Sequence, residues 1–185
     1  NRPLSNGFSS GDARVLIPTT LKERFSQTTR FSVQNASSGN ADITVKFFNA
    51  DAGGALAHTI NLVNVPAGSA RYVDLGTVAA LPANFNGSAT AEGVVSGTSN
   101  PAALVASALE LGTASTYAAA FEGVSGGAAK VYMPSAMCNA FGGQNTAYAV
   151  QNTGASSATV NVTYSNGATQ SSAIAPGAKA SFQTC

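Results

Sequence analysis

Cys138 and Cys185 are the residues of this sequence whose chemistry is most readily stated. In a cytosolic protein such a pair is usually reduced, whereas in an exported protein two cysteines normally form a disulfide. No histidine or acidic residue stands beside either cysteine, so the pair makes a poor metal site. We therefore predict a Cys138–Cys185 disulfide, within one chain or, as the alternative, between subunits. A within-chain bond would stabilise the fold by about 3–4 kcal/mol through chain entropy.

The side chains that could move protons are few and scattered. His58 is the single histidine, and the surrounding ALAHTINL places it on a predicted strand. A strand residue or turn explains His58 more simply than a catalytic base, because no G-x-S-x-G nucleophile motif accompanies it. No spacing singles out a pair of carboxylates for glycoside hydrolysis. The sequence predicts a protein that is not an enzyme and that uses no cofactor. The carboxylates considered are Asp12, Asp42, Asp51, Asp74, Glu23, Glu92, Glu110 and Glu122.

The segment NADAGG (residues 49–54) offers asparagine and aspartate oxygens that could bind calcium. It lacks the alternating acidic residues and the closing glutamate of an EF-hand loop. A hairpin turn accounts for asparagine, aspartate and glycine without an ion. We predict a turn here and no metal site.

Carbohydrate could be attached to this chain as an N-linked glycan or bound by it as a ligand. Three Asn-x-Ser/Thr sequons make Asn35, Asn86 and Asn161 candidate glycosylation sites. The alternation of its strand places Asn161 on the outward face. The chain contains no tryptophan, so its tyrosines are the possible platforms on which a bound sugar could stack. Tyr148 and Tyr164 align with Phe31 and Phe47 and are expected in the core, which leaves Tyr72, Tyr117 and Tyr132.

The elements that must position these residues form two similar series, which we call the first and second copies. FSVQNASSGNADITVKFF (residues 31–48) resembles YAVQNTGASSATVNVTYS (residues 148–165). RVLIP (residues 14–18) and KVYMP (residues 130–134) precede them as apolar opening strands. Apolar and polar residues alternate in the third strand of each series, which follows the V-Q-N strand, and this alternation indicates a half-buried antiparallel strand.

The first copy continues into two segments for which residues 130–185 offer no counterpart. NGSATAEGVV (residues 86–95) is predicted to be a strand, and PAALVASALELG (residues 101–112) a buried strand or a short helix. Regular short strands separated by Gly, Pro and Asn turns indicate an all-β sandwich. The boundaries that we predict are an N-terminal extension and candidate donor strand (1–13), a first sandwich repeat (14–112), a linker (113–129) and an incomplete second repeat (130–185).

The composition favours an exported protein. The hydrophobic content of 44% is enough for a core, but only 9% of residues are charged and the net charge is +1, which gives no reason to expect nucleic acid or an anionic membrane as partner. The charge-poor second copy has either a Thr/Ser/Asn face or a surface covered by neighbouring copies or glycans. No apolar run is long enough for a transmembrane segment. A start at Asn1 fits a processed mature chain or a fragment.

The V-x-I/M-P openings, the aromatic-x-V-Q-N strands and the P-A-G or A-P-G turn before the fifth strand together resemble a known pattern. It is that of the tandem immunoglobulin-like β-sandwich repeats of bacterial secreted and cell-surface proteins. The resemblance covers nearly the whole chain and implies an antiparallel immunoglobulin-like fold with a structural or adhesive role outside the cell. It brings no catalytic residues, and the incomplete second repeat departs from the pattern.

An incomplete sandwich leaves core side chains and strand edges uncovered. Three resolutions stay open: the chain is a fragment of a longer array, the second copy closes as a smaller sheet against the first, or another subunit supplies a strand, for example residues 1–13. We expect the third, with the protein as an extracellular, cell-surface subunit of a homopolymeric filament, pilus-like fibre or surface layer. The alternative is a monomeric adhesin or carbohydrate-binding module, with surface glycans as partners.

Overall fold

The computed structural model describes residues 7–114 and 117–185, which leaves the first part of the candidate donor strand and two residues of the expected linker outside the described residues. Almost all regular structure is strand, with two short 3₁₀ helices. The strands are β1 (Arg14–Lys22), β2 (Gln27–Asn35), β3 (Ala41–Asn49), β4 (Ala55–Val65), β5 (Ala70–Asp74), β6 (Phe85–Val95), β7 (Leu104–Gly112), β8 (Ala118–Glu122), β9 (Ala147–Gln151), β10 (Ala158–Thr163), β11 (Thr169–Ile174) and β12 (Lys179–Gln183); the helices are η1 (Ala50–Ala52) and η2 (Leu75–Thr77).

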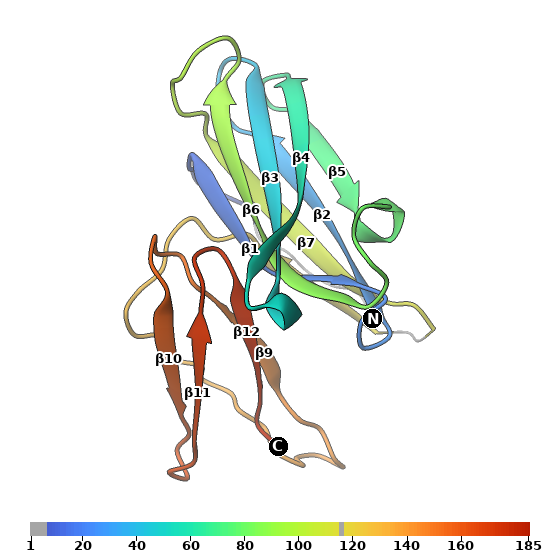
Figure 1. Cartoon of the computed structure of the whole chain (residues 1–185), viewed down its shortest axis with the longest axis vertical. Helices are drawn as coiled ribbons and strands as arrows, with labels where there is room; N and C mark the ends of the chain where they lie inside the picture. The colour runs from blue at the N-terminus through green and yellow to red at the C-terminus, as the bar shows by residue number, and fades with distance from the viewer. Residues whose placement is uncertain (1–6, 115–116) are drawn as a thin grey trace.

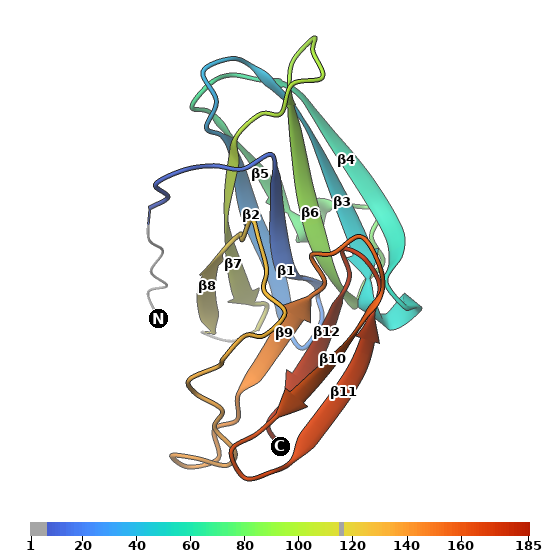
Figure 2. The same ribbon diagram turned by 90° about the vertical axis from the view of Figure 1, so that its left-hand side faces the viewer.

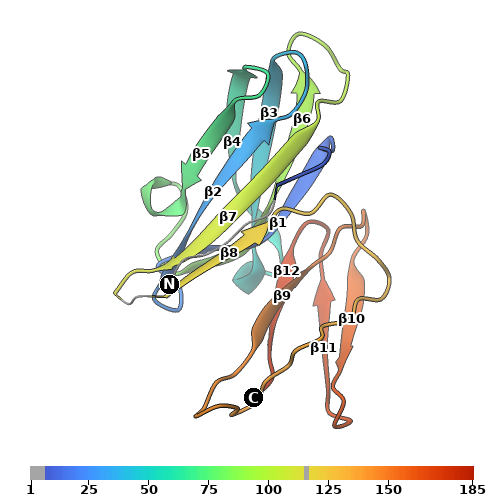
Figure 3. The ribbon, with the colours of Figure 1, turned by 180° about the vertical axis from the view of Figure 1, so that it is seen from behind.

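The first eight strands form a β-sandwich of two four-stranded antiparallel sheets, which we call the N-terminal sandwich (Figure 1). One sheet has the order β1-β6-β3-β4, and the other has the order β5-β2-β7-β8 (Figure 3). Inward-facing side chains of both sheets make one core, in which the rings of Phe31 and Phe47 lie 6.2 Å apart. The prediction of an all-β antiparallel fold is confirmed.

The alternation in the sequence explains why β3 lies where it does. Ile43, Val45 and Phe47 are buried while Thr44 and Lys46 are partly exposed, as the period of two along a strand requires. A one-residue shift in register would expose all three apolar side chains, so the pattern fixes which face of β3 meets the core.

Two segments that the sequence left ambiguous, or assigned to a linker, are strands. Residues 104–112 form β7, paired with β2 along its whole length, and not a helix. Inside the expected linker, β8 pairs with the other edge of β7. An alanine-rich strand is hard to predict because alanine has a low strand propensity, so the free edge of β7 decides the conformation.

Asn35, the asparagine of the first V-Q-N motif, is the last residue of β2, and its side chain forms hydrogen bonds with three backbone groups. The Asn35 Nδ2 donates to the carbonyl oxygens of Gly39 (2.8 Å) and Val65 (3.0 Å), and its Oδ1 accepts from the Ser37 N–H (2.9 Å). Asn35 is completely buried. These bonds satisfy backbone groups of the turn after β2 and of the end of β4, which would otherwise be unpaired inside the protein.

The second V-Q-N motif makes the same network. The Asn152 Nδ2 donates to the carbonyl oxygens of Ser156 (2.8 Å) and Ile174 (2.9 Å), while its Oδ1 accepts from the Gly154 N–H (2.9 Å). The similarity between the two stretches of sequence therefore extends to matched hydrogen bonds.

The last four strands form two two-stranded antiparallel sheets, β10-β11 and β12-β9, which we call the C-terminal sheets. They lie at the end of the N-terminal sandwich next to β1 (Figure 2). Few of their apolar side chains are fully buried, the largest being Ile174 and Phe182. A disulfide joins Cys138 to Cys185 within the chain, with Cα atoms 5.4 Å apart, which confirms the predicted disulfide. In the described part of the chain, no helix has the length and apolar character needed to span a bilayer.

Candidate assembly surface

Two strands of the C-terminal sheets, β9 and β10, lack a partner on a side where their counterparts in the N-terminal sandwich have one. Among residues 7–114 and 117–185, β9 pairs with β12 alone and β10 with β11 alone. In the N-terminal sandwich the corresponding strands, β2 and β3, are each paired on both sides. An unpaired edge presents free N–H and C=O groups to which another strand can add.

The alternation of an antiparallel ladder identifies the free groups on β10. Tyr164, just after the strand, donates its N–H to the Ala168 carbonyl on the β11 side. Every second residue points the same way, so the backbone groups of Thr159, Asn161 and Thr163 face the free edge. This edge therefore offers donors and acceptors in the usual spacing of a β-ladder.

The inner face beside these edges is only half covered. Val150, Val160 and Val162 are half-buried, whereas Val33 and Val45, which match Val150 and Val162 in the first copy, are completely buried. The hydroxyl group of Tyr148 donates to that of Tyr164 (2.9 Å) across this face, and both rings are half-buried and not in a closed core. Apolar area at these positions remains available for burial against an added strand.

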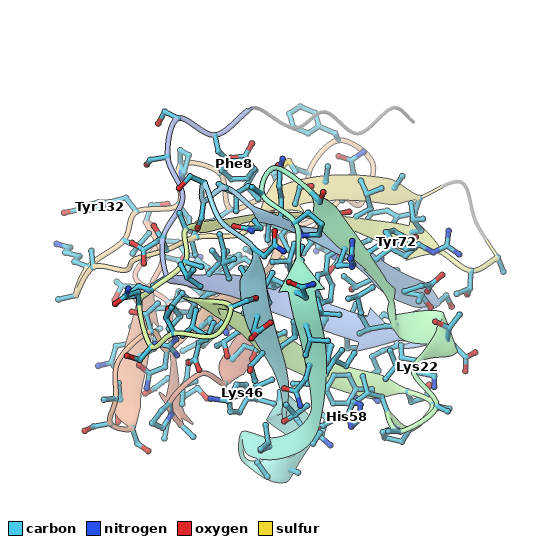
Figure 4. The ribbon with its side chains drawn as sticks, turned by 90° about the horizontal axis from the view of Figure 1, so that it is seen from above. Phe8, Lys22, Lys46, His58, Tyr72 and Tyr132 are labelled. Carbon is cyan, nitrogen blue, oxygen red and sulfur yellow. A yellow bond between two sulfur atoms is a disulfide. The ribbon has the colours of Figure 1, made fainter. Side chains whose placement is uncertain are left out.

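The opening segment of the second copy is not a strand, contrary to the prediction for KVYMP. Val131, Tyr132 and Met133 are 71%, 78% and 53% exposed, and Tyr132 lies at the periphery of the molecule (Figure 4). In the first copy, RVLIP belongs to β1 and pairs with β6, and Val15, Leu16 and Ile17 are at most 2% exposed.

The physical reason for this difference is the missing partner. A strand needs a neighbour to satisfy its backbone, and β6 has no counterpart among residues 130–185. An apolar pattern thus predicts burial correctly only when the pairing strand is present.

The contact between the N-terminal sandwich and the C-terminal sheets is tight and polar. The Ser88 Oγ and the Gln151 Nε2 both donate to the carbonyl oxygen of Gly177 (2.8 Å each), and Gln151 also donates to the Ala89 carbonyl (3.1 Å). Gly177 has a φ of 75°, and a Cβ added to it would lie 2.8 Å from the Phe48 ring. Glycine is therefore required at this turn by both its conformation and its surroundings.

A lysine that no sequence motif singled out is buried in the same contact. Lys179 on β12 is 6% exposed, and its Nζ donates to the Ser181 Oγ (3.1 Å) and the Thr19 Oγ1 (3.4 Å). Burial lowers the pKa of Lys179 to about 8, although the charge of Glu110 opposes this shift. Burial also raises the pKa of Glu110, which accepts a hydrogen bond from Thr19.

This buried lysine gives a pH dependence of known sign. Because the pKa of Lys179 falls from 10.5 to about 8 on folding, the unfolded chain binds more protons between these values, and stability rises with pH. We expect the free energy of unfolding to increase by about 2 kcal/mol between pH 7.5 and 9.5. Denaturant titrations at several pH values measure it.

Substitution of lysine by arginine provides the controls, because the guanidinium group of arginine stays protonated over this pH range. Lys179→Arg should remove the rise, whereas Lys46→Arg, at a partly exposed ion pair with Glu92, should retain it. Stability that is constant or falling from pH 7.5 to 9.5 in the unaltered protein would contradict the prediction.

The sequon asparagines lie in different surroundings. Asn35 and Asn86 are buried, and the Asn86 Nδ2 donates to Asp51 Oδ1 (2.9 Å). Burial of both side chains in the folded chain disfavours a glycan on Asn35 or Asn86, and their glycosylation stays a prediction. Asn161 is exposed on β10, and its glycosylation stays a prediction.

The remaining candidate groups are not brought together. His58 lies on β4 (Figure 4). Its ring is stacked on that of Phe47, with centroids 6.4 Å apart. Residues 49–54 form the predicted turn, in which the Asn49 side chain accepts from the Asp51 N–H. Within residues 7–114 and 117–185 no group of three or more His, Cys, Asp and Glu side chains could hold a metal ion. Tyr72 is exposed on β5, in the N-terminal sandwich and not in the C-terminal sheets.

Comparison with known proteins gives limited similarity. No known protein family matches the sequence, and no curated protein matches it. The crystal structure of Thermotoga maritima 1070 can be superposed with a TM-score of 0.45 at 16% sequence identity, covering 62% of this chain and 94% of that chain.

Proposed function

We propose that this chain is an extracellular structural protein whose copies assemble into a filament, pilus-like fibre or surface layer by β-strand complementation. The observation that carries the proposal is the contrast between KVYMP and RVLIP. Similar apolar segments are exposed and unpaired in one place and buried beside β6 in the other. A strand added from outside would satisfy both the free backbone groups and the exposed side chains.

The proposal includes the tandem immunoglobulin-like repeat inferred from the sequence. The matched networks of Asn35 and Asn152 support it, because identical capping bonds in two places are typical of a duplicated unit. The disulfide supports an oxidising compartment, since such bonds persist mainly outside the cytosol. The low content of charged residues fits a surface that neighbouring copies cover.

The direction of assembly is head to tail, with residues 1–13 of one copy as the donor segment. Donor and acceptor are then different surfaces of the same protein. A contact of this kind repeats without limit and builds a filament unless the rotation between copies closes a ring.

Electron microscopy of the purified protein over a range of concentrations tests the proposal. We expect filaments or sheets for the unaltered chain and none after deletion of residues 1–13, because the donor is lost. Circular dichroism should show that the N-terminal sandwich of the deleted protein still folds. The exposed-ring variant Tyr72→Ala should assemble normally and serves as the matched control.

Monodisperse particles at every concentration would refute assembly. Together with glycan binding that Tyr72→Ala removes, such particles would favour the second candidate, a monomeric adhesin or carbohydrate-binding module. Assembly that survives the deletion would exclude residues 1–13 as the donor.

A further inference from the structure

The strand that the C-terminal sheets lack has a defined place in the fold. In the N-terminal sandwich β6 lies between β1 and β3 and pairs with both. By sequence, residues 130–134 correspond to the start of β1, and β10 corresponds to β3. The matching place among residues 130–185 is therefore at the free edge of β10, with residues 130–134 as the partner on its other side. A strand that enters there must resemble β6 on both of its faces.

The N-terminal segment of the chain resembles β6 in sequence. Residues 6–13 read NGFSSGDA, and residues 86–93 of β6 read NGSATAEG. Both begin with Asn-Gly, continue with small residues, and place an acidic residue before a final small one. The one clear departure is Phe8, which stands where β6 has Ser88.

We propose that residues 7–13 of one protein molecule bind to the C-terminal sheets of another molecule. There they take the place that β6 occupies in the N-terminal sandwich. This inference rests on the proposed function. It specifies the contact between two subunits, which we call the joint: the donor segment is residues 7–13, the acceptor is the free edge of β10, and the register is that of β6 on β3. The free edge of β9 receives no donor in this proposal.

The small side chains of the segment fit the face that would meet the core. Ala89 and Ala91 point into the N-terminal core and are completely buried, and a Cβ at Gly87 would collide with the Phe48 carbonyl oxygen. Large side chains of the neighbouring strands fill the space in front of them. The donor has glycine or serine at all three matching positions, Gly7, Ser9 and Gly11, while Tyr148, Tyr164 and Phe182 provide the large side chains of the acceptor.

Charge complementarity fixes the same register. Glu92 of β6 is opposite Arg14 of β1, and their side chains form an ion pair at 3.5 Å. In the proposed joint Asp12 takes the place of Glu92, and Lys130 of the acceptor takes the place of Arg14. A shift of one residue would put Asp12 on the inner face, where a carboxylate has no partner.

Part of the donor is already bonded in the single chain. Asp12 and Leu104 exchange two backbone hydrogen bonds, of 3.0 and 2.8 Å. Donation through Asp12 replaces these two bonds by bonds to the acceptor, so the gain comes from the residues before Asp12 and from the acceptor. There, Val131 and Met133 correspond to the core residues Val15 and Ile17 and become buried once their segment pairs with the donor. Residues 130–134 thus close over the donor strand as β1 closes over β6.

Cysteine cross-linking tests the register. Because Thr90 is opposite Lys46 in the β3–β6 ladder, Ser10 of the donor should lie opposite Thr163 of the acceptor. The variant Ser10→Cys/Thr163→Cys should give a ladder of disulfide-linked multimers on mild oxidation of filaments, as facing strand residues are within disulfide range. Phe8→Cys/Ser165→Cys is a second pair of the same register. Ser9→Cys/Thr163→Cys, with side chains on opposite faces, should stay monomeric on a denaturing gel.

A charge exchange tests the ion pair. Lys130→Asp and Asp12→Lys should each raise the concentration needed for filament formation about fivefold, because attraction becomes repulsion. The combined variant should return to within about twofold of the unaltered protein.

The outcomes separate the joint from the proposed function. Filaments that form but give a ladder with the opposite-face pair, or no ladder with either matched pair, overturn the register while assembly stands. The same holds if the combined charge variant is no better than the single ones. Absence of filaments from the unaltered protein overturns the proposed function, and the joint with it. Ladders from both matched pairs, with rescue by charge exchange, support the joint.

Discussion

Replacing Asn35 with alanine is expected to lower the free energy of unfolding by about 4 kcal/mol, the largest effect that we foresee for a single side chain. The substitution leaves the carbonyl oxygens of Gly39 and Val65 and the Ser37 N–H without partners in a buried site. Each unsatisfied buried group costs about 1–3 kcal/mol. Equilibrium denaturation, followed by circular dichroism, measures the change.

Matched variants separate the loss of hydrogen bonds from the loss of volume. Asn35→Asp keeps the shape and the acceptor but removes both donated bonds, so it should destabilise the protein at least as much as alanine. Asn40→Ala removes an exposed hydrogen bond to Asn64 and should change stability by less than about 0.5 kcal/mol. Asn152→Ala should release the C-terminal sheets, seen as faster hydrogen exchange there, while the N-terminal sandwich keeps its protection. An Asn35→Ala protein within about 1 kcal/mol of the original would show that these bonds contribute little.

Loss of the Cys138–Cys185 disulfide is expected to have an effect of similar size. The bond spans 47 residues, and opening a loop of that length costs about 4 kcal/mol on chain-entropy grounds. Because the C-terminal sheets bury few large apolar side chains, the variant Cys138→Ser/Cys185→Ser should lose the order of these sheets first. Denaturation monitored together with hydrogen exchange locates the loss.

Reduction provides the control for the disulfide prediction. A reducing agent should bring the unaltered protein to the stability of the double-serine variant and leave that variant unchanged. Equal stability of the oxidised protein and the variant would mean that packing alone holds the C-terminal sheets.

Alternation and turn residues were sufficient to predict much of the fold. The pattern of Ile43, Val45 and Phe47 predicted both the strand and its buried face. The glycines and asparagine of residues 49–54 predicted the turn between β3 and β4. These signals are local, and local signals decide such elements because the side-chain period fixes the face that each strand buries.

What the sequence could not provide were effects that depend on a distant partner. KVYMP and RVLIP have nearly the same pattern, and only the presence of β6 separates an exposed segment from a buried strand. The structural role of Asn35 in the V-Q-N motif, and the burial of Lys179, likewise follow from neighbours far along the chain. The alanines of β8 form a strand because β7 offers a free edge. The alanines themselves do not predict a strand.

The turn at Gly177 sets the mechanical character of any fibre built from this chain. With the Phe48 ring against its Cα and hydrogen bonds from Ser88 and Gln151 around its carbonyl group, the C-terminal sheets have no room to swing about the N-terminal sandwich. In the proposed fibre each subunit would then transmit torque as a stiff rod. The compliance would lie in the joints between subunits, and a larger side chain at position 177 would introduce a hinge in the middle of every rod.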